Sequence, residues 1–195
     1  ESLSVEWTCI SFREEFGTTL DEIVRTRGAE RACSYCGVLR RRSLNTAAKE
    51  HGATKLAVGF NLDDEAQTVL MNVLRGDAGR LTRAEQPHPE FVPRIKPFRA
   101  IPEKEVALYA LLHLEGYDMR RCPYAESGLR TEIREMLNAF TYRHPSTKHS
   151  LLRLGDELRR GEREAEAIRI CERCGEPCGI VCRACRILDE VRRSA

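Results

Sequence analysis

The pattern of apolar and polar residues predicts both strands and helices in the first part of the chain. Residues 4–12 alternate as in a strand, and residues 55–60 form a short apolar run typical of a buried parallel strand. Helical periodicity bounded by capping residues predicts helices over 18–26, from near 37 to 52, and over 62–75. This succession favours an α/β fold, an open parallel sheet with helices on both faces.

Beyond residue 76 the pattern becomes mainly helical. Polar residues and prolines predict a loop over 77–93, and residues 94–98 are one more candidate strand. Three helices are expected over 102–115, 127–139 and 146–160. A proline opens the first of these helices, where its fixed backbone angle and missing N–H are tolerated.

The composition fits one full domain with a small appendage. The chain has 195 residues, and 42% of them are hydrophobic. We expect three parts: a partial α/β nucleotide-binding domain over 1–100, a helical segment over 101–165 and a C-terminal zinc knuckle over 166–195. No apolar run approaches the roughly 20 residues that cross a bilayer, and no signal-peptide pattern opens the chain. We therefore expect a cytoplasmic protein without a membrane partner.

The net charge of +2 gives no argument for a nucleic-acid partner. Local clusters of arginine would have to provide such a contact, and each cluster is also explained as the solvated face of a helix. The clusters are Arg40–Arg42, Arg120–Arg121, Arg159–Arg160 and Arg192–Arg193.

The C-terminal cysteines have the spacing C-x2-C-x7-C-x2-C, formed by Cys171, Cys174, Cys182 and Cys185. Two such pairs can surround Zn²⁺ with four thiolates in a tetrahedron. Because so short a segment cannot build a core, the metal must provide most of its folding free energy. Cys178 is a fifth cysteine whose spacing fits less well. The knuckle either contacts RNA or is a structural clip, and the sequence leaves both interpretations open.

A second group of cysteines allows several interpretations. Cys33 and Cys36 lie just before a predicted helix, where the helix dipole and nearby arginines favour thiolates. They could be a redox dithiol, half of a zinc site or two ligands of an iron–sulfur cluster. Cys122 precedes Pro123, an arrangement known from iron–sulfur proteins, and would add a third thiolate. Cys9 lies in a strand pattern and is expected to be a small buried hydrophobe.

The turn after the apolar strand carries a third candidate site. Ligands of open α/β sheets bind beyond the carboxyl ends of the strands, and Gly59 would allow a nucleotide to approach the backbone closely. Asn61 suits the N-cap of the next helix, where the dipole favours acidic residues. Capping explains one or two acidic residues but not three in a row, which favours a functional role for Asp63 or Asp64.

Several segments together resemble the tRNA 2-thiouridine synthetases of the pyrophosphate-loop superfamily, in particular their archaeal and thermophile branch. The similarity runs in order over essentially the whole chain. The segments are Cys33–Arg42, Gly59–Thr68, Met71–Asp77, Cys122–Ala125 and the terminal C-x-x-C pairs.

The resemblance implies an adenine-nucleotide α-hydrolase-like fold and a tRNA-uridine 2-sulfurtransferase activity. In that reaction ATP, with Mg²⁺, adenylates the C2 oxygen of a tRNA uridine, and sulfur then displaces AMP. Cys33, Cys36 and Cys122 would hold a [4Fe-4S] cluster whose fourth iron has no protein ligand, and Cys33 and Cys122 would thereby take part in catalysis. The implied partners are tRNA, a ubiquitin-like sulfur carrier with a C-terminal thiocarboxylate, and a second copy of the chain in a homodimer.

By the same resemblance, Asp64 corresponds to an acidic residue that the family needs for catalysis. Arg40 and Gly59 correspond to positions that line the ATP site. Relatives often carry lysine at the position of Arg40; arginine keeps the positive charge but presents it as a planar fork.

Two parts of the family pattern are absent from the 195 residues: the Ser-Gly-Gly-x-Asp-Ser loop that holds the ATP pyrophosphate, and an N-terminal zinc knuckle. Both would precede Glu1, so we expect the chain to be the C-terminal part of a longer enzyme and inactive in ATP turnover by itself. One alternative is a tRNA 2-thiocytidine synthetase, which generally lacks the terminal knuckle. The other is a non-catalytic zinc-binding RNA-binding scaffold. The target, a wobble or a T-loop uridine, is left open.

Overall fold

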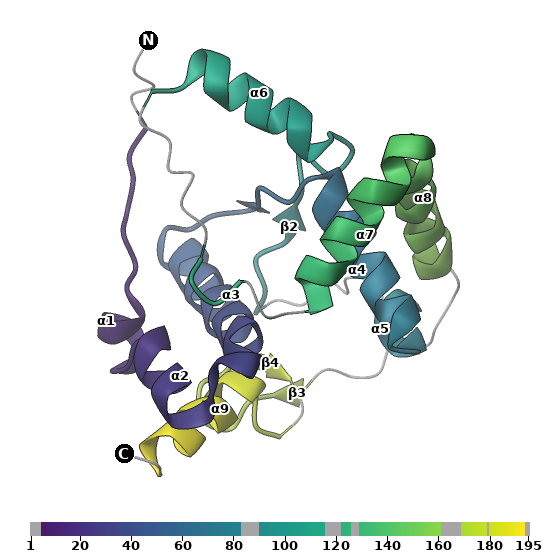
Figure 1. Ribbon diagram of the computed structural model, residues 1–195. Helices are drawn as coiled ribbons and strands as arrows, with labels where there is room; N and C mark the ends of the chain where they lie inside the picture. Colours follow the sequence, from purple (N-terminus) through teal and green to yellow (C-terminus); the bar gives the residue numbers. More distant parts are fainter. Residues whose placement is uncertain are drawn as a thin grey trace. The chain divides into compact units, whose positions relative to one another are not determined.

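The computed structural model describes residues 5–82, 90–115, 122–125, 129–160, 169–178 and 180–193. The chain forms two compact units, and each unit has its own core. Unit 1 comprises Glu1–Ala53 and Ile168–Ala195, and unit 2 comprises Thr54–Ala167. Figure 1 labels their helices and strands. The domain limits expected at residues 100 and 165 stay a prediction.

The described residues of unit 1 form helices and one short antiparallel hairpin. The hairpin pairs β3 with β4, with Arg169 opposite Cys178 and Ile170 opposite Pro177. The elements are α1 (Phe12–Phe16), α2 (Leu20–Arg27), the short helix η1 (Ala29–Arg31), α3 (Ala32–Glu50), β3 (Arg169–Ile170), β4 (Pro177–Cys178) and α9 (Arg183–Arg192).

The first helices of unit 1 start at side chains that cap them. Ser11 accepts a hydrogen bond from the backbone N–H of Glu14 at 3.2 Å and starts α1. The strand predicted over 4–12 is therefore wrong, and none of the described residues 5–11 lies in a strand. The helix predicted over 18–26 is present as α2, with a reciprocal capping box between Thr19 and Glu22.

Helix α3 is longer than predicted. It begins at Ala32 rather than near Gly37, and its N-cap residue Arg31 makes no side-chain capping hydrogen bond. At the other end, Gly52 takes a φ of 62° and donates its N–H to the carbonyl of Lys49 at 2.9 Å. This left-handed glycine terminates the helix as the sequence predicted.

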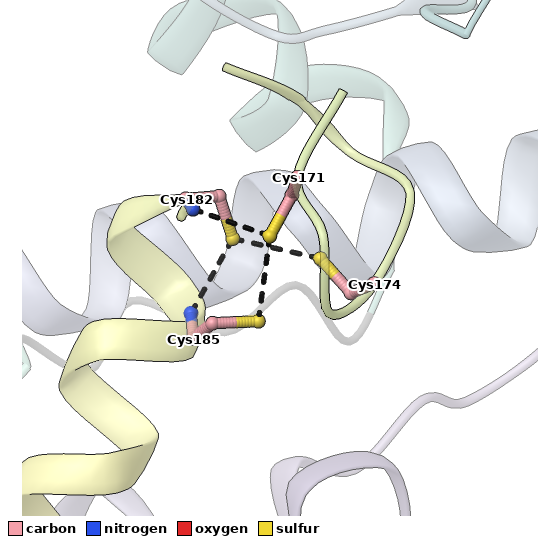
Figure 2. A group of neighbouring side chains, drawn as sticks. All are labelled: Cys171, Cys174, Cys182 and Cys185. Carbon is pink, nitrogen blue, oxygen red and sulfur yellow. Dashed lines mark hydrogen bonds between the residues drawn. The ribbon is translucent and has the colours of Figure 1, made fainter. Parts of the chain in front are cut away.

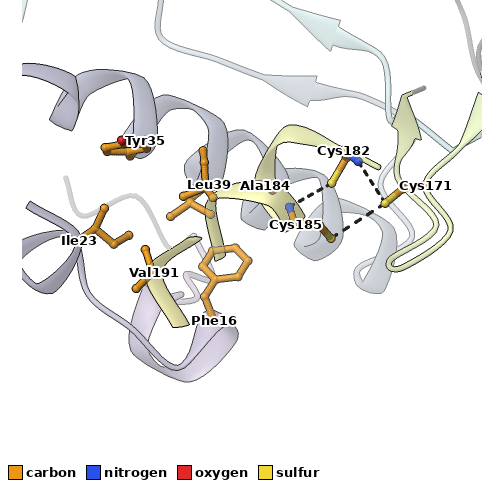
Figure 3. Packing of buried hydrophobic residues seen from close by; sticks show 10 residues of the cluster. Phe16, Ile23, Tyr35, Leu39, Cys171, Cys182, Ala184, Cys185 and Val191 are labelled. Carbon is orange, nitrogen blue, oxygen red and sulfur yellow. Dashed lines mark hydrogen bonds between the residues drawn. The ribbon is translucent and has the colours of Figure 1, made fainter. Parts of the chain in front are cut away.

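The core of unit 1 joins the helices to the C-terminal cysteines. Figure 3 shows most of the buried cluster, in which side chains of α1, α2 and α3 pack with those of α9 and of the knuckle. The buried members are Phe16, Ile23, Tyr35, Leu39, Cys171, Cys182, Ala184, Cys185, Ile187 and Val191. The knuckle is therefore part of the hydrophobic core of unit 1 and not an appendage to it.

Unit 2 contains a two-stranded parallel sheet and five helices among its described residues. The strands pair with Leu56 opposite Arg94 and Ala57 opposite Ile95, so the α/β class is confirmed. The helix α5 lies where only a loop was predicted. The elements are β1 (Leu56–Ala57), α4 (Leu62–Leu74), α5 (Ala78–Thr82), β2 (Arg94–Ile95), α6 (Glu103–His113), α7 (Leu129–Arg143) and α8 (Thr147–Arg160).

Helix α4 packs against both α7 and α8 in the core of unit 2. Ala66 of α4 is buried with Ile133 and Leu137 of α7. On α8, a Cβ added at Gly155 would lie 2.7 Å from Cγ2 of Val69, so the glycine lets α8 approach α4 closely. Among the described residues, no helix combines the length and apolar character needed to span a membrane.

Candidate functional site

The four cysteines of the terminal motif come together in unit 1. Cys171 and Cys174 lie in the turn after β3, and Cys182 and Cys185 lie at the start of α9 (Figure 2). Their sulfur atoms all lie within 4.8 Å of one another; the Cys171–Cys185 and Cys174–Cys182 distances are 4.0 and 3.5 Å. A tetrahedral zinc site with Zn–S bonds of about 2.3 Å has sulfur atoms about 3.8 Å apart. The group therefore fits a tetrahedral metal ion.

Backbone N–H groups donate hydrogen bonds to sulfur atoms of this group. The N–H of Cys182 donates to Sγ of Cys171 at 3.3 Å, and the N–H of Cys185 donates to Sγ of Cys182 at 3.4 Å. Burial alone would raise the pKa of Cys171. The backbone donors of Cys182, Arg173 and Cys174 outweigh it and lower the pKa of Cys171 to about 6. One ligand is thus already prepared for metal binding, because a thiol binds a metal ion as its thiolate.

The fifth cysteine of the knuckle differs from these four. Cys178 lies on β4 and is half-buried. Burial, followed by the nearby thiolate charges of Cys171 and Cys182, raises the pKa of Cys178 to about 11. Cys178 is therefore a neutral thiol at neutral pH, and it is not among the four sulfur atoms that converge.

Arg42 of α3 supplies a positive charge beside the knuckle. Its Nη1 donates to Sγ of Cys185 at 3.7 Å, and its guanidinium lies 5.5 Å from the ring centroid of Phe16. Burial lowers the pKa of Arg42, but its charge interactions with Cys174, Cys185 and Cys182 raise it above its ordinary value. This arginine would compensate the excess negative charge of the site once a metal binds all four cysteines as thiolates, and it is not part of a purely solvated helix face.

The pair Cys33 and Cys36 lies inside the first turn of α3, not just before the helix as predicted. Ala32 and Tyr35 are buried on one side of this turn. Helical spacing of three, four and seven residues places Cys33, Cys36 and Arg40 together on another face. Cys33 and Arg40 are exposed and Cys36 is half-buried. Two thiols and one cation of the predicted site therefore share one accessible face of a single helix.

Cys122 belongs to unit 2. It is exposed and begins a turn in which its carbonyl accepts the N–H of Ala125 at 3.0 Å. Since the two units are not placed relative to one another, the convergence of Cys122 with Cys33 and Cys36 stays a prediction.

The acidic turn at the start of α4 is built by local and distant partners together. Asn61 is the N-cap: its side chain accepts the N–H of Asp64 at 3.0 Å, and its own N–H donates to the Asp64 carboxylate at 3.2 Å. Asp63 accepts the N–H of Glu103 at 2.8 Å and a hydrogen bond from Lys148. Glu65 pairs with the ammonium group of Lys96 at 2.8 Å. All three acidic residues therefore have structural partners, so their number no longer argues for function, and the functional role expected for Asp63 or Asp64 stays a prediction.

Exposure separates Asp64 from its two neighbours. The Asp64 side chain is 28% exposed, against 6% for Asp63 and 7% for Glu65. Nη1 of Arg130 lies 3.5 Å from Oδ1 of Asp64, and Arg130 also donates to Oγ1 of Thr68 at 3.1 Å. Asp64 is the acidic residue of this turn whose carboxylate a ligand can reach.

Gly59 lies just after β1, and its backbone conformation does not require glycine, because its φ is not positive. No atom of the described residues, apart from its chain neighbours, lies within 4 Å of a Cβ built at this position. Neither strain nor packing explains the glycine, and the open space leaves room for a ligand to approach the backbone.

Known proteins similar to the chain act in tRNA thiolation. The chain is 38% identical over 210 residues to the tRNA 2-thiolation protein NcsA of Haloferax volcanii, covering 98% of the chain and 65% of that protein. It is 36% identical over 187 residues to cytoplasmic tRNA 2-thiolation protein 1 of Caenorhabditis elegans, covering 93% of the chain and 50% of that protein. The chain is a homologue of the tRNA 2-thiolation proteins. No protein-family model matches it.

A solved structure agrees with this similarity to the tRNA 2-thiolation proteins. The U34-tRNA thiolase NcsA from Methanococcus maripaludis, solved with its [4Fe-4S] cluster, matches with a TM-score of 0.76 and 37% identity. The match covers 88% of the chain and 56% of that protein. The predicted resemblance and fold class are confirmed, and the chain spans between half and two thirds of the length of these relatives.

Three polar residues beside the candidate sites of this tRNA 2-thiolation homologue were not predicted. Lys148 holds Asp63, Arg130 borders Asp64, and Arg183 contacts the turn that carries Cys33 and Cys36. Each lies more than 60 residues from its partner, with separations of 85, 66 and 149 for Lys148–Asp63, Arg130–Asp64 and Arg183–Ser34. Sequence periodicity reports only neighbours along the chain and gave no indication of them.

Proposed function

We propose that the chain is part of a tRNA-uridine 2-sulfurtransferase, which forms 2-thiouridine by ATP-dependent adenylation of the uridine C2 oxygen followed by sulfur transfer. The observation that carries the proposal is the face of α3 with Cys33, Cys36 and Arg40, in a chain whose homologues act in tRNA 2-thiolation. The target we propose is U34 of tRNA, because the matched Methanococcus maripaludis protein is a U34-tRNA thiolase.

Cys33, Cys36 and Cys122 are the residues that would hold a [4Fe-4S] cluster. All three are at least partly accessible, and thiolates are the ligands that such clusters use. When bound, a cluster with three protein ligands supplies one iron without a protein ligand, where a sulfide can be held for transfer.

Three residues are proposed to act in the site for ATP and Mg²⁺: Arg40, Gly59 and Asp64. Arg40 is exposed and would neutralise phosphate charge. Gly59 leaves space for a nucleotide beyond the carboxyl end of β1. Asp64 is the accessible acidic residue of the next turn and would be the catalytic carboxylate, held in place by its hydrogen bonds with Asn61. The 195 residues do not include the Ser-Gly-Gly-x-Asp-Ser loop that binds pyrophosphate, so ATP turnover by the chain alone is not expected.

Zn²⁺ is the metal we propose for the knuckle, because four thiolates at these distances suit its tetrahedral preference. The proposed partners are tRNA and a ubiquitin-like sulfur carrier with a C-terminal thiocarboxylate, in the cytoplasm. A homodimer is also proposed. Helix α6 supports it, because Leu108, Tyr109, Leu111 and Leu112 are all more than half exposed. Sedimentation equilibrium tests the dimer directly.

Two alternative functions are less well supported. A tRNA 2-thiocytidine synthetase generally lacks a terminal knuckle, whereas four cysteines converge in this one. A scaffold that only binds zinc would not need exposed Cys33 and half-buried Cys36 on one helix face with Arg40. Anaerobic purification separates the interpretations. A brown protein whose iron–sulfur absorbance disappears in Cys122→Ala supports the thiolase, and a colourless protein that contains zinc alone supports the scaffold.

A chimera tests the activity itself. Residues 1–195 would replace the matching part of the Methanococcus maripaludis thiolase in a host that lacks its own enzyme. We expect 2-thiouridine at U34 to return, as measured by mass spectrometry of digested tRNA, and Cys122→Ala and Asp64→Asn to abolish it. Cys9→Ala is the matched control, because Cys9 is exposed as well and not buried as the sequence predicted. Normal thiolation in Cys122→Ala would overturn the proposal.

A further inference from the structure

One stripe of α3 carries the contacts with the terminal knuckle. Ser34, Val38, Arg42 and Asn45 follow one another at spacings of four, four and three residues, so they lie along one side of the helix. Ser34 accepts from Arg183, Arg42 donates to Sγ of Cys185, and Asn45 donates to Glu176 at 3.2 Å. Val38 packs against the buried cluster that contains Cys171 and Cys182. The knuckle therefore lies along α3 from its first turn to its fourth.

The first contact of this stripe is placed between the two cysteines of the candidate cluster site. Nη2 of Arg183 donates to Oγ of Ser34 at 2.6 Å, and Ser34 lies between Cys33 and Cys36. Arg183 directly follows the knuckle ligand Cys182 and is the first residue of α9. A side chain next to one cysteine group is thus hydrogen-bonded to the hydroxyl group of a residue that lies between the cysteines of the other group.

The first turn of α3 needs an external support of this kind. The short helix η1 precedes it directly, and the N–H of Ala32 donates to the carbonyl of Ala29. The N-cap residue, Arg31, makes no side-chain capping hydrogen bond, so the turn has no cap of the serine or aspartate type. Uncapped helix ends open more readily than the middle of a helix. Buried Ala32 and Tyr35 hold one side of the turn, and Arg183 holds Ser34 on another.

We propose that Arg183 is a positioning residue for Cys33 and Cys36: the metal knuckle fixes the start of α9, and Arg183 transmits that order through Ser34 to the turn that holds the two cysteines. The proposal deepens the sulfurtransferase function proposed above and rests on it for the role of the cysteines. The order of the knuckle and the order of the turn with Cys33 and Cys36 are then coupled within unit 1.

Hydrogen exchange tests the coupling without any iron–sulfur cluster or tRNA. The full 195-residue chain is loaded with Zn²⁺, and amide exchange is followed at residues 36–38, whose helical acceptors are the carbonyls of residues 32–34. Losing one hydrogen bond from a charged donor at an exposed site should speed this exchange about fivefold in Arg183→Ala. The rate at which iodoacetamide alkylates Cys33 and Cys36, measured by peptide mass spectrometry, should also differ between this variant and the wild type.

Three further variants make the result specific. Arg183→Lys keeps a donor and should restore part of the protection. Arg186→Ala removes an exposed arginine from the same helix and should leave exchange at 36–38 unchanged. Ser34→Ala removes the same hydrogen bond but leaves the knuckle intact, so its exchange at residues 36–38 should be as fast as in Arg183→Ala. This variant therefore separates loss of the hydrogen bond from any loosening of α9. The double variant should exchange no faster than either single variant.

Wild-type exchange at residues 36–38 in both Ser34→Ala and Arg183→Ala would overturn the coupling. So would equal effects of Arg183→Ala and Arg186→Ala. Because the assay uses neither cluster nor tRNA, the coupling can fail while thiolation by the chimera succeeds, and thiolation can fail while the coupling holds.

Discussion

Replacing Lys148 by methionine should destabilise unit 2 strongly, because it leaves a buried carboxylate without its cation. The side chains of Lys148 and Asp63 are only 11% and 6% exposed, and the ammonium group also donates to Oδ1 of Asn138 at 2.7 Å. Removing one partner of a buried ion pair costs about 3–5 kcal/mol. The N–H of Glu103 still donates to Asp63 at 2.8 Å, which favours the lower end, about 3 kcal/mol.

The pH dependence of this loss is a second, independent test. Without Lys148, the buried carboxylate of Asp63 has no cation beside it, and uptake of a proton would remove the unpaired charge. An acid with a raised folded pKa destabilises the fold at high pH, and the penalty disappears as the pH falls and the carboxyl group takes up a proton. The difference in unfolding free energy between Lys148→Met and the wild type should therefore be largest at neutral pH and shrink in acid.

The measurement is denaturant unfolding followed by far-UV circular dichroism at several pH values. Lys104→Met is the control, because Lys104 is an exposed lysine at the start of α6, and it should change stability by less than about 0.5 kcal/mol. Adding Asp63→Asn to Lys148→Met should recover most of the loss, since no buried charge is then unpaired. A loss below about 1 kcal/mol, or one that does not vary with pH, would refute the reasoning.

Three other changes have expected outcomes. Gly155→Ala should destabilise unit 2 by about 1–2 kcal/mol in thermal unfolding, because the new methyl group overlaps Val69; Gly79→Ala, where a Cβ has room, should not. A hydrogen bond from Arg13, followed by the N–H of Thr19, lowers the pKa of Glu22 below its ordinary 4.5; stability should fall as the pH drops below that value, and Glu22→Gln should remove this dependence. A chelator that strips the knuckle metal should expose the amides of α2 and α3 to exchange while α4 and α7 stay protected, because the knuckle cysteines belong only to the core of unit 1.

The elements that the sequence predicted well are those whose ends carry their own capping chemistry. Thr19 with Glu22 and Asn61 with Asp64 form capping boxes within four residues, so the starts of α2 and α4 are local properties. The start of α3 has no such cap, and the prediction placed it near Gly37 instead of Ala32. A helix that begins without a side-chain cap gives no sequence mark at its first residue.

The predicted strand over 4–12 failed for a different reason. Alternation of apolar and polar residues shows that a segment could cover one face of a sheet, but a strand exists only when another strand pairs with it. The run at 55–60 has its partner in residues 94–95, although only Leu56–Ala57 pairs. Residues 5–11 have no such partner among the described residues of unit 1, and Ser11 instead caps a helix.

The acidic turn shows where local reasoning ends and what it leaves for function. From the sequence, helix capping could explain only one or two of the three acidic residues. The other partners are Lys148 and Lys96, which lie 85 and 31 residues away in the sequence from the acidic residues that they contact. Only packing brings those lysines to α4. With these two ion pairs assigned, Asp64 is the acidic residue in this turn without a lysine partner among the described residues. Its side chain caps α4 and is also partly exposed to solvent. A catalytic role for Asp64 therefore rests on its accessibility at the end of β1, and the number of acidic residues in the turn adds nothing to it.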